Sequence, residues 1–492
     1  MRRALMVLGL LASVHFLSAA DSPVSLYPGN PHHLLFRGRP TVVVTSAEHY
    51  GAVLNPDFDY IKYLDTLAQD ELNYTRVFSG SYVEPAGAFG IANNDLAPAP
   101  GRFLAPWARS ATAGYANGGN KFDLDKWSPE FFERLRGFVS EAGKREIIVE
   151  ITLFSSIYGD AQWKVNPFNP ANNVNATDIS DRRLVNTLDN GKILGYQEQL
   201  TRKLVSELSG FDNVLFEIQN EPYSDQTVTP RTINPYLPKN CVEEWQNRVD
   251  LANQASLRWQ SRIAEFIVSE AAKSGVKRLI AQNVCNFAFP VADISPNASI
   301  LNFHYAYPEA VRWNYGRDLP ISYDETGFLP QSDTIYRTQA WNFMLAGGGI
   351  FNHLDYSFAV GHESGDLTDI KAPGWGGAAL RKQLRILKQF LESLDFERMR
   401  PDASFVVTAP GVSVQSLAWP GRQYAVYLAG SGPCELRLKL PGGEYQIEWV
   451  NVEDGAVVKS ETVEHRGGTI TLISPSFSED IALRIRSAVG QL

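Results

Sequence analysis

The sequence predicts an α/β protein, a (β/α)8 TIM barrel followed by a small antiparallel β-sandwich domain. Its 492 residues are too many for one simple core and suit a barrel-sized domain of roughly 250 to 400 residues plus a second, smaller domain. Between residues 41 and 394, short β-branched runs alternate with amphipathic helical stretches, as in parallel strands joined by crossover helices. From about Pro401 the pattern changes to short alternating runs separated by turn residues, which indicates an all-β module.

Eight apolar runs are the candidate barrel strands, and eight such units close a barrel. They span residues 41–45, 74–78, 147–153, 214–218, 278–282, 300–303, 321–324 and 349–354. Helix starts between them are marked by Ser128-Pro129, an N-cap followed by proline in the first turn, and by Ser332-Asp333. Phe131, Leu135 and Val139 then fall on one face of the helix that begins at Pro129.

The predicted domain boundaries follow from these patterns. Residues 1–20 form a signal peptide, residues 21–398 an N-terminal hairpin plus the catalytic barrel, and residues 399–492 an accessory β-sandwich domain. The hairpin is expected to turn at Arg37-Gly38 and to plug the bottom of the barrel. Eight strands are predicted in the C-terminal domain: 405–408, 412–417, 423–428, 435–440, 445–451, 456–462, 469–472 and 481–485.

The N-terminus and the composition restrict the compartment and the partners. Arg2 and Arg3 precede an apolar stretch and the small residues 18–20, so we expect cleavage after Ala20 and a secreted or periplasmic protein with net charge −11. No later segment is long and apolar enough to span a membrane. The acidic balance and the lack of a long basic run make nucleic acid an unlikely partner. Three distant cysteines, at 241, 285 and 434, allow at most one disulfide and show no metal-ligand spacing.

Long connections follow the second, third and fourth predicted strands, at residues 80–126, 155–190 and 222–242. In a barrel these connections lie at the carboxyl ends of the strands, where the reacting groups gather. Trp107, Tyr158, Trp163 and Phe168 in these loops suggest an aromatic rim for stacking on sugar faces, or else ordinary loop packing.

Two predicted strands end in glutamates. Strand four runs from Val214 into Asn220-Glu221-Pro222, and strand seven from Ile321 into Glu325. Side chains at the carboxyl ends of barrel strands face the same mouth, so we expect Glu221 and Glu325 to share one pocket. A pair of carboxyl groups across a glycosidic bond is what glycoside hydrolysis requires, one as proton donor and one as nucleophile.

These motifs resemble the clan-A retaining glycoside hydrolases, the superfamily that includes the cellulase-like family 5 enzymes. The resemblance covers residues 41–394 and implies that Glu221, after Asn220, is the acid/base and that Glu325 is the nucleophile. It implies that Arg76 supports the nucleophile and that His304 with Tyr305 or Tyr307 lines the site. Tyr356 stands near the place of the usual strand-eight tryptophan and is expected to form part of the pocket floor.

The chemistry then assigns an environment to each group. Glu221 should hold a proton near neutral pH through a raised pKa, whereas Arg76 should keep Glu325 ionised. Asn220 would hydrogen-bond the sugar 2-hydroxyl. Glu217 is expected to be a buried structural partner, and His49 either packs in the core or contacts sugar.

The prediction is therefore a secreted retaining β-glycoside hydrolase that acts on an oligo- or polysaccharide through a covalent glycosyl-enzyme intermediate. The main alternative is a non-catalytic carbohydrate-binding protein on the same barrel. A hydrolase with metal-bound water is the second alternative, but the spacing of His353 with Asp355 and of His362 with Glu363 lacks a ligand-triad signature. We expect no cofactor and no metal. Exo or endo action, sugar configuration and oligomeric state are left open by the residues.

Overall fold

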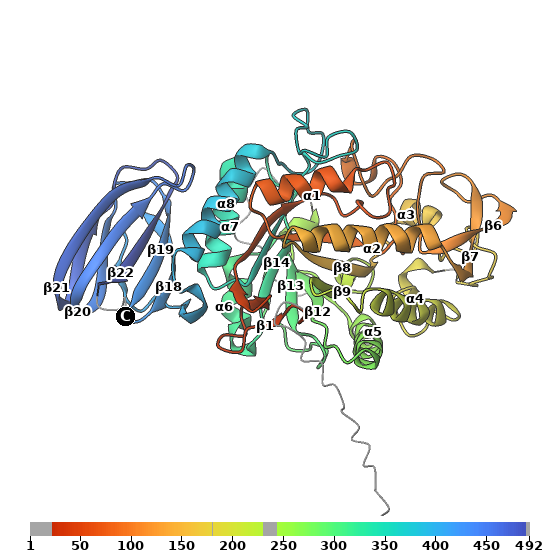
Figure 1. Cartoon of the computed structure of the whole chain (residues 1–492), viewed down its shortest axis with the longest axis horizontal. Coiled ribbons are helices and arrows are strands. Elements are labelled where there is room, and N and C mark those ends of the chain that lie inside the picture. Colours follow the sequence, from red (N-terminus) through yellow and green to blue (C-terminus); the bar gives the residue numbers. More distant parts are fainter. Residues whose placement is uncertain (1–21, 180, 230–243, 489–492) are drawn as a thin grey trace, which may run out of the picture.

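Eight parallel strands form the wall of a barrel at the centre of the computed structural model, which describes residues 22–179, 181–229 and 244–488 (Figure 1). In chain order they are β4 (Val43–Ala47), β5 (Tyr74–Phe78), β8 (Ile148–Ser155), β9 (Val214–Asn220), β12 (Ile280–Asn286), β13 (Ile300–His304), β14 (Ile321–Glu325) and β15 (Ile350–Leu354). From β5 onward each strand pairs with the next, and β15 returns to pair with β4, so that only β4 and β5 are not paired through their backbones. Across the remaining seam, Thr45 Oγ1 donates to the carbonyl of Tyr74 at 2.6 Å. The predicted barrel and its eight strands are confirmed.

Helices surround the strands on the outside (Figure 1). They are α1 (Tyr60–Gln69), α2 (Pro129–Lys144), α3 (Asp160–Val165), α4 (Ile193–Glu207), α5 (Gln254–Lys273), α6 (Pro308–Asn314), α7 (Asp333–Leu345) and α8 (Ala378–Glu392). The predicted start of α2 is confirmed, because Ser128 Oγ accepts a hydrogen bond from Phe131 N at 3.3 Å. Helix α7 begins at Asp333, as predicted from Ser332-Asp333, although Ser332 makes no side-chain cap.

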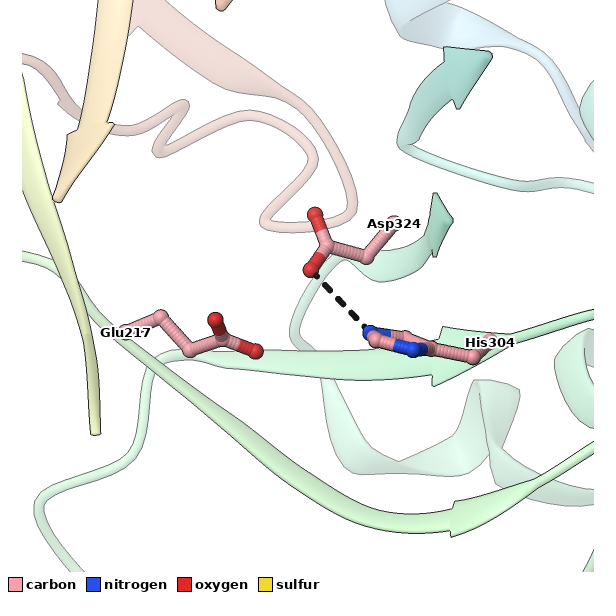
Figure 2. A group of neighbouring side chains, drawn as sticks. All are labelled: Glu217, His304 and Asp324. Atoms are coloured by element: carbon pink, nitrogen blue, oxygen red, sulfur yellow. Dashed lines mark ion pairs between the residues drawn. The ribbon is translucent and has the colours of Figure 1, made fainter. Parts of the chain in front are cut away.

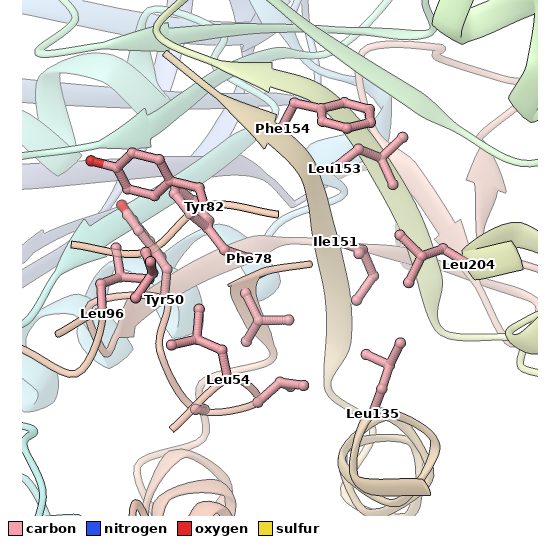
Figure 3. Close-up of a cluster of buried hydrophobic side chains, with 14 of the residues drawn as sticks. Tyr50, Leu54, Phe78, Tyr82, Leu96, Leu135, Ile151, Leu153, Phe154 and Leu204 are labelled. Atoms are coloured by element: carbon pink, nitrogen blue, oxygen red, sulfur yellow. The ribbon is translucent and has the colours of Figure 1, made fainter. Parts of the chain in front are cut away.

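The core between helices and strands explains why these elements close on one another. Figure 3 shows Leu135 of α2 and Leu204 of α4 in one cluster with Ile151 of β8, and all three are fully buried. The same cluster continues toward the barrel mouth through Tyr50 and Phe78, whose rings stack at 5.1 Å. The floor of the mouth is therefore held by the core that stabilises the barrel wall.

A small three-stranded sheet covers the amino-terminal end of the barrel. It comprises β1 (Ser25–Leu26), β2 (Leu34–Phe36) and β3 (Arg39–Thr41). The predicted hairpin turns at Arg37 and Gly38, which have φ of 49° and 76°, as a two-residue turn of this kind requires. Leu34 and Phe36 pack against residues near the starts of the barrel strands, so the hairpin closes the barrel bottom.

The long connections carry structure of their own, which the sequence patterns did not predict. Strands β6 (Trp107–Ala113) and β7 (Asn120–Trp127) form a separate two-stranded sheet, and β10 (Thr227–Val228) and β11 (Leu251–Ala252) pair beside β12. Of the two alternatives for the loop aromatics, loop packing holds for Trp107 and Phe168, which are buried and pack edge to face at 5.1 Å. Trp163 is partly buried against the same core.

The C-terminal strands form an antiparallel sheet domain with fewer and longer strands than predicted. They are β16 (Arg400–Pro401), β17 (Val406–Thr408), β18 (Val412–Trp419), β19 (Gln423–Gly430), β20 (Glu435–Val450), β21 (Val457–Ile473) and β22 (Asp480–Ser487). Residues 435–440 and 445–451 were predicted as two strands but belong to one, because β20 runs through Pro441-Gly442-Gly443. Before this point β20 pairs with β17 and after it with β22, while β21 accompanies it on the other side.

The C-terminal sheet packs on the barrel helices rather than standing apart. Trp341 of α7 stacks on Tyr427 of β19 at 5.4 Å, and Arg337 of α7 donates to both oxygens of Asp480 at 2.6 and 2.9 Å. The sheet is thus joined to the barrel by both apolar and ionic contacts. The predicted signal peptide lies outside the described residues, and among the helices of the described chain none has the length and hydropathy needed to cross a membrane.

Candidate active site

The carboxyl ends of the barrel strands surround a small, partly open pocket. Glu221 and Glu325 both line it, as predicted, together with Asn220, Tyr305 and Tyr356. One carboxylate oxygen of Glu221, one of Glu325 and a nitrogen of His304 all lie within 4.8 Å of one another. Two carboxyl groups from strands three βα units apart therefore meet in one pocket.

Glu221 follows the last residue of β9 and takes a left-handed backbone conformation with φ of 48°. A non-glycine residue rarely adopts this conformation, and here it turns the chain into the short helix η4 (Pro222–Ser224). Its carboxylate accepts hydrogen bonds from Tyr158 Oη at 2.6 Å and from Tyr223 Oη at 2.9 Å. His304 Nδ1 lies 3.1 Å from the same carboxylate.

Glu325 is the last residue of β14, and its two oxygens have different partners. Tyr305 Oη donates to Oε1 at 2.8 Å, and Arg76 Nη1 donates to Oε2 at 3.4 Å. The sequence left open whether Tyr305 or Tyr307 contacts Glu325, and the structure shows that Tyr305 does. The ring of Tyr307 stacks on Phe287, with centroids 5.9 Å apart. Both contacts hold the Glu325 carboxylate in one orientation.

Arg76 of β5 occupies the centre of a buried ion network below the pocket. Its guanidinium pairs with Glu217, with Asp324 at 3.1 Å and with Glu325, and Arg76, Glu217 and Asp324 are fully buried. Burial would raise the pKa of Asp324, but the charges of Arg76 and His304 outweigh it and lower that pKa. Glu217 is the structural partner that the sequence predicted.

His304, at the end of β13, connects the two glutamates. Its Nδ1 lies near Glu221 and is 3.7 Å from Glu325 Oε2, while Nε2 lies 3.6 Å from Asp324 Oδ2. Burial alone would lower its pKa, but Glu325, Asp324 and Glu221 raise it to about 10. The raised pKa favours the imidazolium form of His304 at neutral pH, so the ring carries a proton beside the Glu221 carboxylate.

The expected raised pKa of Glu221 is not found in the free protein. Burial does act to raise it, but the hydrogen bond and charge of His304, with the hydroxyls of Tyr158 and Tyr223, lower the pKa below its ordinary value. The physical reason is that the three neighbours all stabilise the carboxylate, and no sequence pattern indicated that Tyr158 would be one of them.

Both the nitrogen and the oxygen of the Asn220 side-chain amide make hydrogen bonds that hold it in place. Its Nδ2 donates to Tyr158 Oη at 2.7 Å and to Ser155 Oγ at 3.2 Å, and its Oδ1 accepts from Arg76 at 2.8 Å. Both amide hydrogens are thus engaged, and Oδ1 retains one lone pair with which to accept a sugar hydroxyl.

Two groups of acidic and histidine side chains have the spacing of a metal site: Glu217, His304 and Asp324, drawn in Figure 2, and Glu221, His304 and Glu325. In the first group, however, the guanidinium of Arg76 already contacts both carboxylates. His304 with its raised pKa adds a second positive charge in both groups. A metal ligand must be a neutral imidazole, so a metal ion would have to displace the proton of His304 and, in the first group, compete with Arg76 for the carboxylates.

The remaining sequence candidates fall in and around the pocket. His49 and Tyr356 line it, and the imidazole of His49 lies 3.4 Å from Glu84, so His49 stands at the pocket wall. Asp355 pairs with Arg381 at 2.9 Å, and His362 pairs with Asp366. Neither His353 nor His362 reaches the pocket lining.

Sequence reasoning missed Glu84, Phe89 and Phe328, which also line the pocket. The first two lie in an irregular connection after β5, where neither periodicity nor a strand end marks a functional residue. Phe328 follows Gly327 three residues beyond Glu325, and proximity to that strand end was the only available signal.

Comparison with known proteins supports the fold. No protein-family model matches the chain, and no curated protein matches its sequence. Among solved structures, one described as a glycoside hydrolase is similar with a TM-score of 0.60 and 12% identity, covering 97% of this chain and 99% of the other. A glycoside hydrolase family 5 structure from Bacteroides vulgatus ATCC 8482 is similar with a TM-score of 0.59 and 11% identity, covering 97% and 96%. The chain shares the barrel and C-terminal sheet architecture of these structures.

Proposed function

We propose that the protein hydrolyses a β-glycosidic bond with retention of configuration, with Glu325 as nucleophile and Glu221 as acid/base. The observation that carries the proposal is that one carboxylate oxygen of Glu221 and one of Glu325 lie within 4.8 Å of each other in one pocket. Retaining enzymes hold the pair about 5 to 5.5 Å apart, whereas inverting enzymes leave roughly 6.5 to 9.5 Å for a water. The similarity in fold to glycoside hydrolase structures supports the same reaction class.

In the first step, a Glu325 oxygen attacks the anomeric carbon while the bond to the leaving oxygen breaks and Glu221 protonates that oxygen. Arg76 and Tyr305 hold Glu325 in one orientation before attack. In the second step, the Glu221 carboxylate takes a proton from water, which attacks the same carbon and releases Glu325.

The proton for the first step is supplied within the His304–Glu221 pair. His304 Nδ1 and Glu221 Oε1 are 3.1 Å apart, and in the free protein the proton that can move between them lies on the imidazole. A bound sugar displaces water from the pocket, and removal of water favours the neutral pair over the ionic one. Substrate binding therefore moves the proton to Glu221, where the leaving oxygen needs it.

The test is a screen of the purified protein against aryl β-glycosides and plant, algal and fungal polysaccharides, with NMR detection of the first-formed anomer. We expect hydrolysis of at least one β-glycoside with a β-configured first product. Glu325→Ala should abolish that turnover. Glu363→Gln should preserve it, because Glu363 is a buried carboxylate that accepts from the backbone N–H groups of Asp59 and Gly361 and does not line the pocket. An α-configured first product would contradict retention, and inactivity on the whole panel would favour the non-catalytic carbohydrate-binding alternative.

We also propose that the protein is exported, with cleavage after Ala20. The support is the sequence of the first twenty residues, a positive start followed by an apolar stretch and small residues. N-terminal sequencing of the protein recovered from a secreting host should begin at Asp21. Recovery of intact Met1 in the cytoplasmic fraction would contradict export.

A further inference from the structure

One buried carboxyl group below the pocket lacks the cation that such a group usually requires. Glu150 of β8 reaches the barrel interior with 1% of its surface exposed. Arg76 is its register partner on β5, but the guanidinium contacts Glu217, Asp324 and Glu325 instead. No arginine, lysine or histidine of the described chain makes an ion pair with Glu150. An ionised carboxylate in this position would carry a large desolvation cost.

Three carboxyl groups meet at one amide nitrogen of β13. Asn302 Nδ2 lies 2.9 Å from Glu150 Oε1, 3.1 Å from Glu217 Oε1 and 3.0 Å from Asp324 Oδ2. An amide nitrogen carries two hydrogens, so it cannot donate to all three groups. Turning the amide round would place its oxygen against three acceptors, which is worse. The arrangement therefore favours one carboxyl group that carries a hydrogen of its own.

Glu150 is the member of this group that fits the role. Arg76 supplies a positive charge to Glu217 and Asp324, whereas the hydroxyl of Tyr74, which donates to Glu150 Oε2, is a neutral partner. Burial and the charges of Asp324 and Glu217 raise the pKa of Glu150 well above its ordinary value. Geometry and charge therefore agree that the hydrogen belongs to Glu150.

The acceptor for this hydrogen is Asp324. The carboxyl groups of Glu150 and Asp324 are close enough for a hydrogen bond, and Asp324 Oδ1 is buried with no donor among the described residues. Figure 2 shows the other side of the same carboxylate, where Asp324 Oδ2 faces His304 Nε2 at 3.6 Å. Asp324 thus lies between Glu150 and the imidazole that contacts Glu221.

We propose that Glu150 is a neutral carboxylic acid while the enzyme works and that it is a positioning residue, whose hydroxyl donates to Asp324 and holds that carboxylate beside His304. The inference rests on the proposed function, in which His304 gives a proton to Glu221 across 3.1 Å. A hydrogen bond from Glu150 stabilises the negative charge of Asp324 and so weakens its attraction for the imidazolium proton. That proton then moves more readily to Glu221.

The first test is thermal unfolding of wild type and Glu150→Gln from pH 5 to pH 8. A carboxyl group with a raised folded-state pKa contributes stability that is complete below its ordinary value of 4.5 and is lost as the pH rises toward the folded value. Glutamine does not titrate, so the wild type should lose about one degree of melting temperature relative to Glu150→Gln for each pH unit. The gap at one pH depends on how well glutamine fits, but its change with pH depends on the proton of Glu150. A constant gap would overturn the proposal.

Asp355→Asn is the matched control, because Asp355 is also fully buried and does not line the pocket. Burial would raise its pKa, but Arg381 at 2.9 Å outweighs burial and lowers that pKa. Its stability contribution is present above the ordinary value of 3.8 and is lost as the pH falls. The gap between wild type and Asp355→Asn should therefore stay constant from pH 5 to pH 8. The same trend in both variants would overturn the assignment to Glu150.

The second test is the pH–rate profile on one aryl glycoside. Glu150→Gln exchanges one neutral donor for another, so the alkaline limb should not move. Glu150→Met removes the donor, and Asp324 then attracts the imidazolium proton more strongly. The limb should move upward by about one pH unit, with kcat lowered about tenfold and KM little changed. A downward move in Glu150→Gln would reveal a lost negative charge, and an unmoved limb in Glu150→Met would leave Glu150 without a positioning role. Either result would overturn the proposal.

A measurement on the unmodified protein guards against variants that fail to fold. Neutron diffraction from crystals of the perdeuterated wild type at pH 7 should show a deuteron on the Glu150 carboxyl group, directed at Asp324. A bare Glu150 carboxylate would overturn the proposal. This measurement and the melting series need no substrate, so they test Glu150 separately from the proposed function. Absence of turnover on every glycoside would overturn the proposed function, and the link between Glu150 and catalysis would fall with it.

Discussion

The barrel interior and the core of the C-terminal sheet are both fully buried, yet they are built from opposite chemistry. Arg76, Glu150, Glu217 and Asp324 lie inside the barrel with at most 1% of their surface exposed. The core of the C-terminal sheet consists of aliphatic and aromatic residues with Cys434. Because a buried ion network adds little stability over apolar packing, the charges inside the barrel indicate a role in positioning the site.

The two regions also differ in how many of their non-glycine residues take a left-handed backbone conformation. Tyr50, Glu221, Phe287, Tyr305 and Phe328 follow barrel strands and have φ between 48° and 59°, whereas the described residues of the C-terminal sheet show positive φ only at glycines. Such conformations cost energy and persist where the surroundings impose them, commonly at active sites. The contrast teaches that strain and buried charge are concentrated at the barrel mouth, while the sheet resembles an ordinary packed domain.

The largest expected effects come from replacing two buried arginines: Arg76 inside the barrel and Arg337 at the contact between the barrel and the C-terminal sheet. Arg76→Met should lower kcat/KM by about 10³-fold or more, because Glu325 loses the cation that contacts and orients it. The same change should cost about 3–5 kcal/mol of stability, because it leaves the buried carboxylates of Glu217 and Asp324 without their partner. Arg337→Met, which breaks the Arg337–Asp480 contact between barrel and sheet, should cost comparable stability and leave kcat within a few-fold. Thermal unfolding and kinetics on one aryl glycoside check both. Equal losses of kcat in Arg76→Met and Arg337→Met would contradict the claim that buried charge inside the barrel serves the active site.

A smaller effect is expected from the hydroxyl that holds Glu221. Tyr158→Phe removes a hydrogen bond to the Glu221 carboxylate and therefore raises the pKa of that carboxyl group. The alkaline limb of the pH–rate profile, where the acid loses its proton, should move upward by about one to two pH units. Tyr424→Phe in the C-terminal sheet is the matched control and should leave the profile unchanged. A downward shift in Tyr158→Phe would contradict the assigned contact.

Much of the site was predictable because strand ends are marked in the sequence. The runs 214–218 and 321–324 located Glu221 and Glu325, and both lie where the barrel geometry requires. The lowered pKa of Glu221 was not predictable, because it depends on how closely His304 and the loop residue Tyr158 approach the carboxylate, and tertiary packing sets that approach. Glu84 was missed for the same reason. Pro441-Gly442-Gly443 was taken for a turn between two strands, whereas it is the point at which β20 changes partners.

The smallest effect concerns stability and pH. The folded-state pKa of His304 is raised to about 10, so its contribution to stability is complete below its ordinary value of 6.5 and is lost as the pH rises through 10. Wild type should therefore melt a few degrees above His304→Gln at pH 6, with the gap closing toward pH 10. The same scan with His465→Gln, a partly exposed histidine of the C-terminal sheet, should show no such trend. A gap that widens with pH would contradict the cationic His304.

The central claim, that Glu221 and Glu325 have different roles, is tested most directly by azide. Glu221→Ala retains the nucleophile, so a dinitrophenyl β-glycoside of the preferred sugar should still form the glycosyl-enzyme, and azide, which needs no base, should restore turnover and yield a β-glycosyl azide. In Glu325→Ala no glycosyl-enzyme can form, and azide in the vacated space can give only the α-anomer. The account predicts opposite anomers from the two variants, identified by NMR. The same anomer from both, or full activity of Glu221→Ala on a natural saccharide, would contradict it.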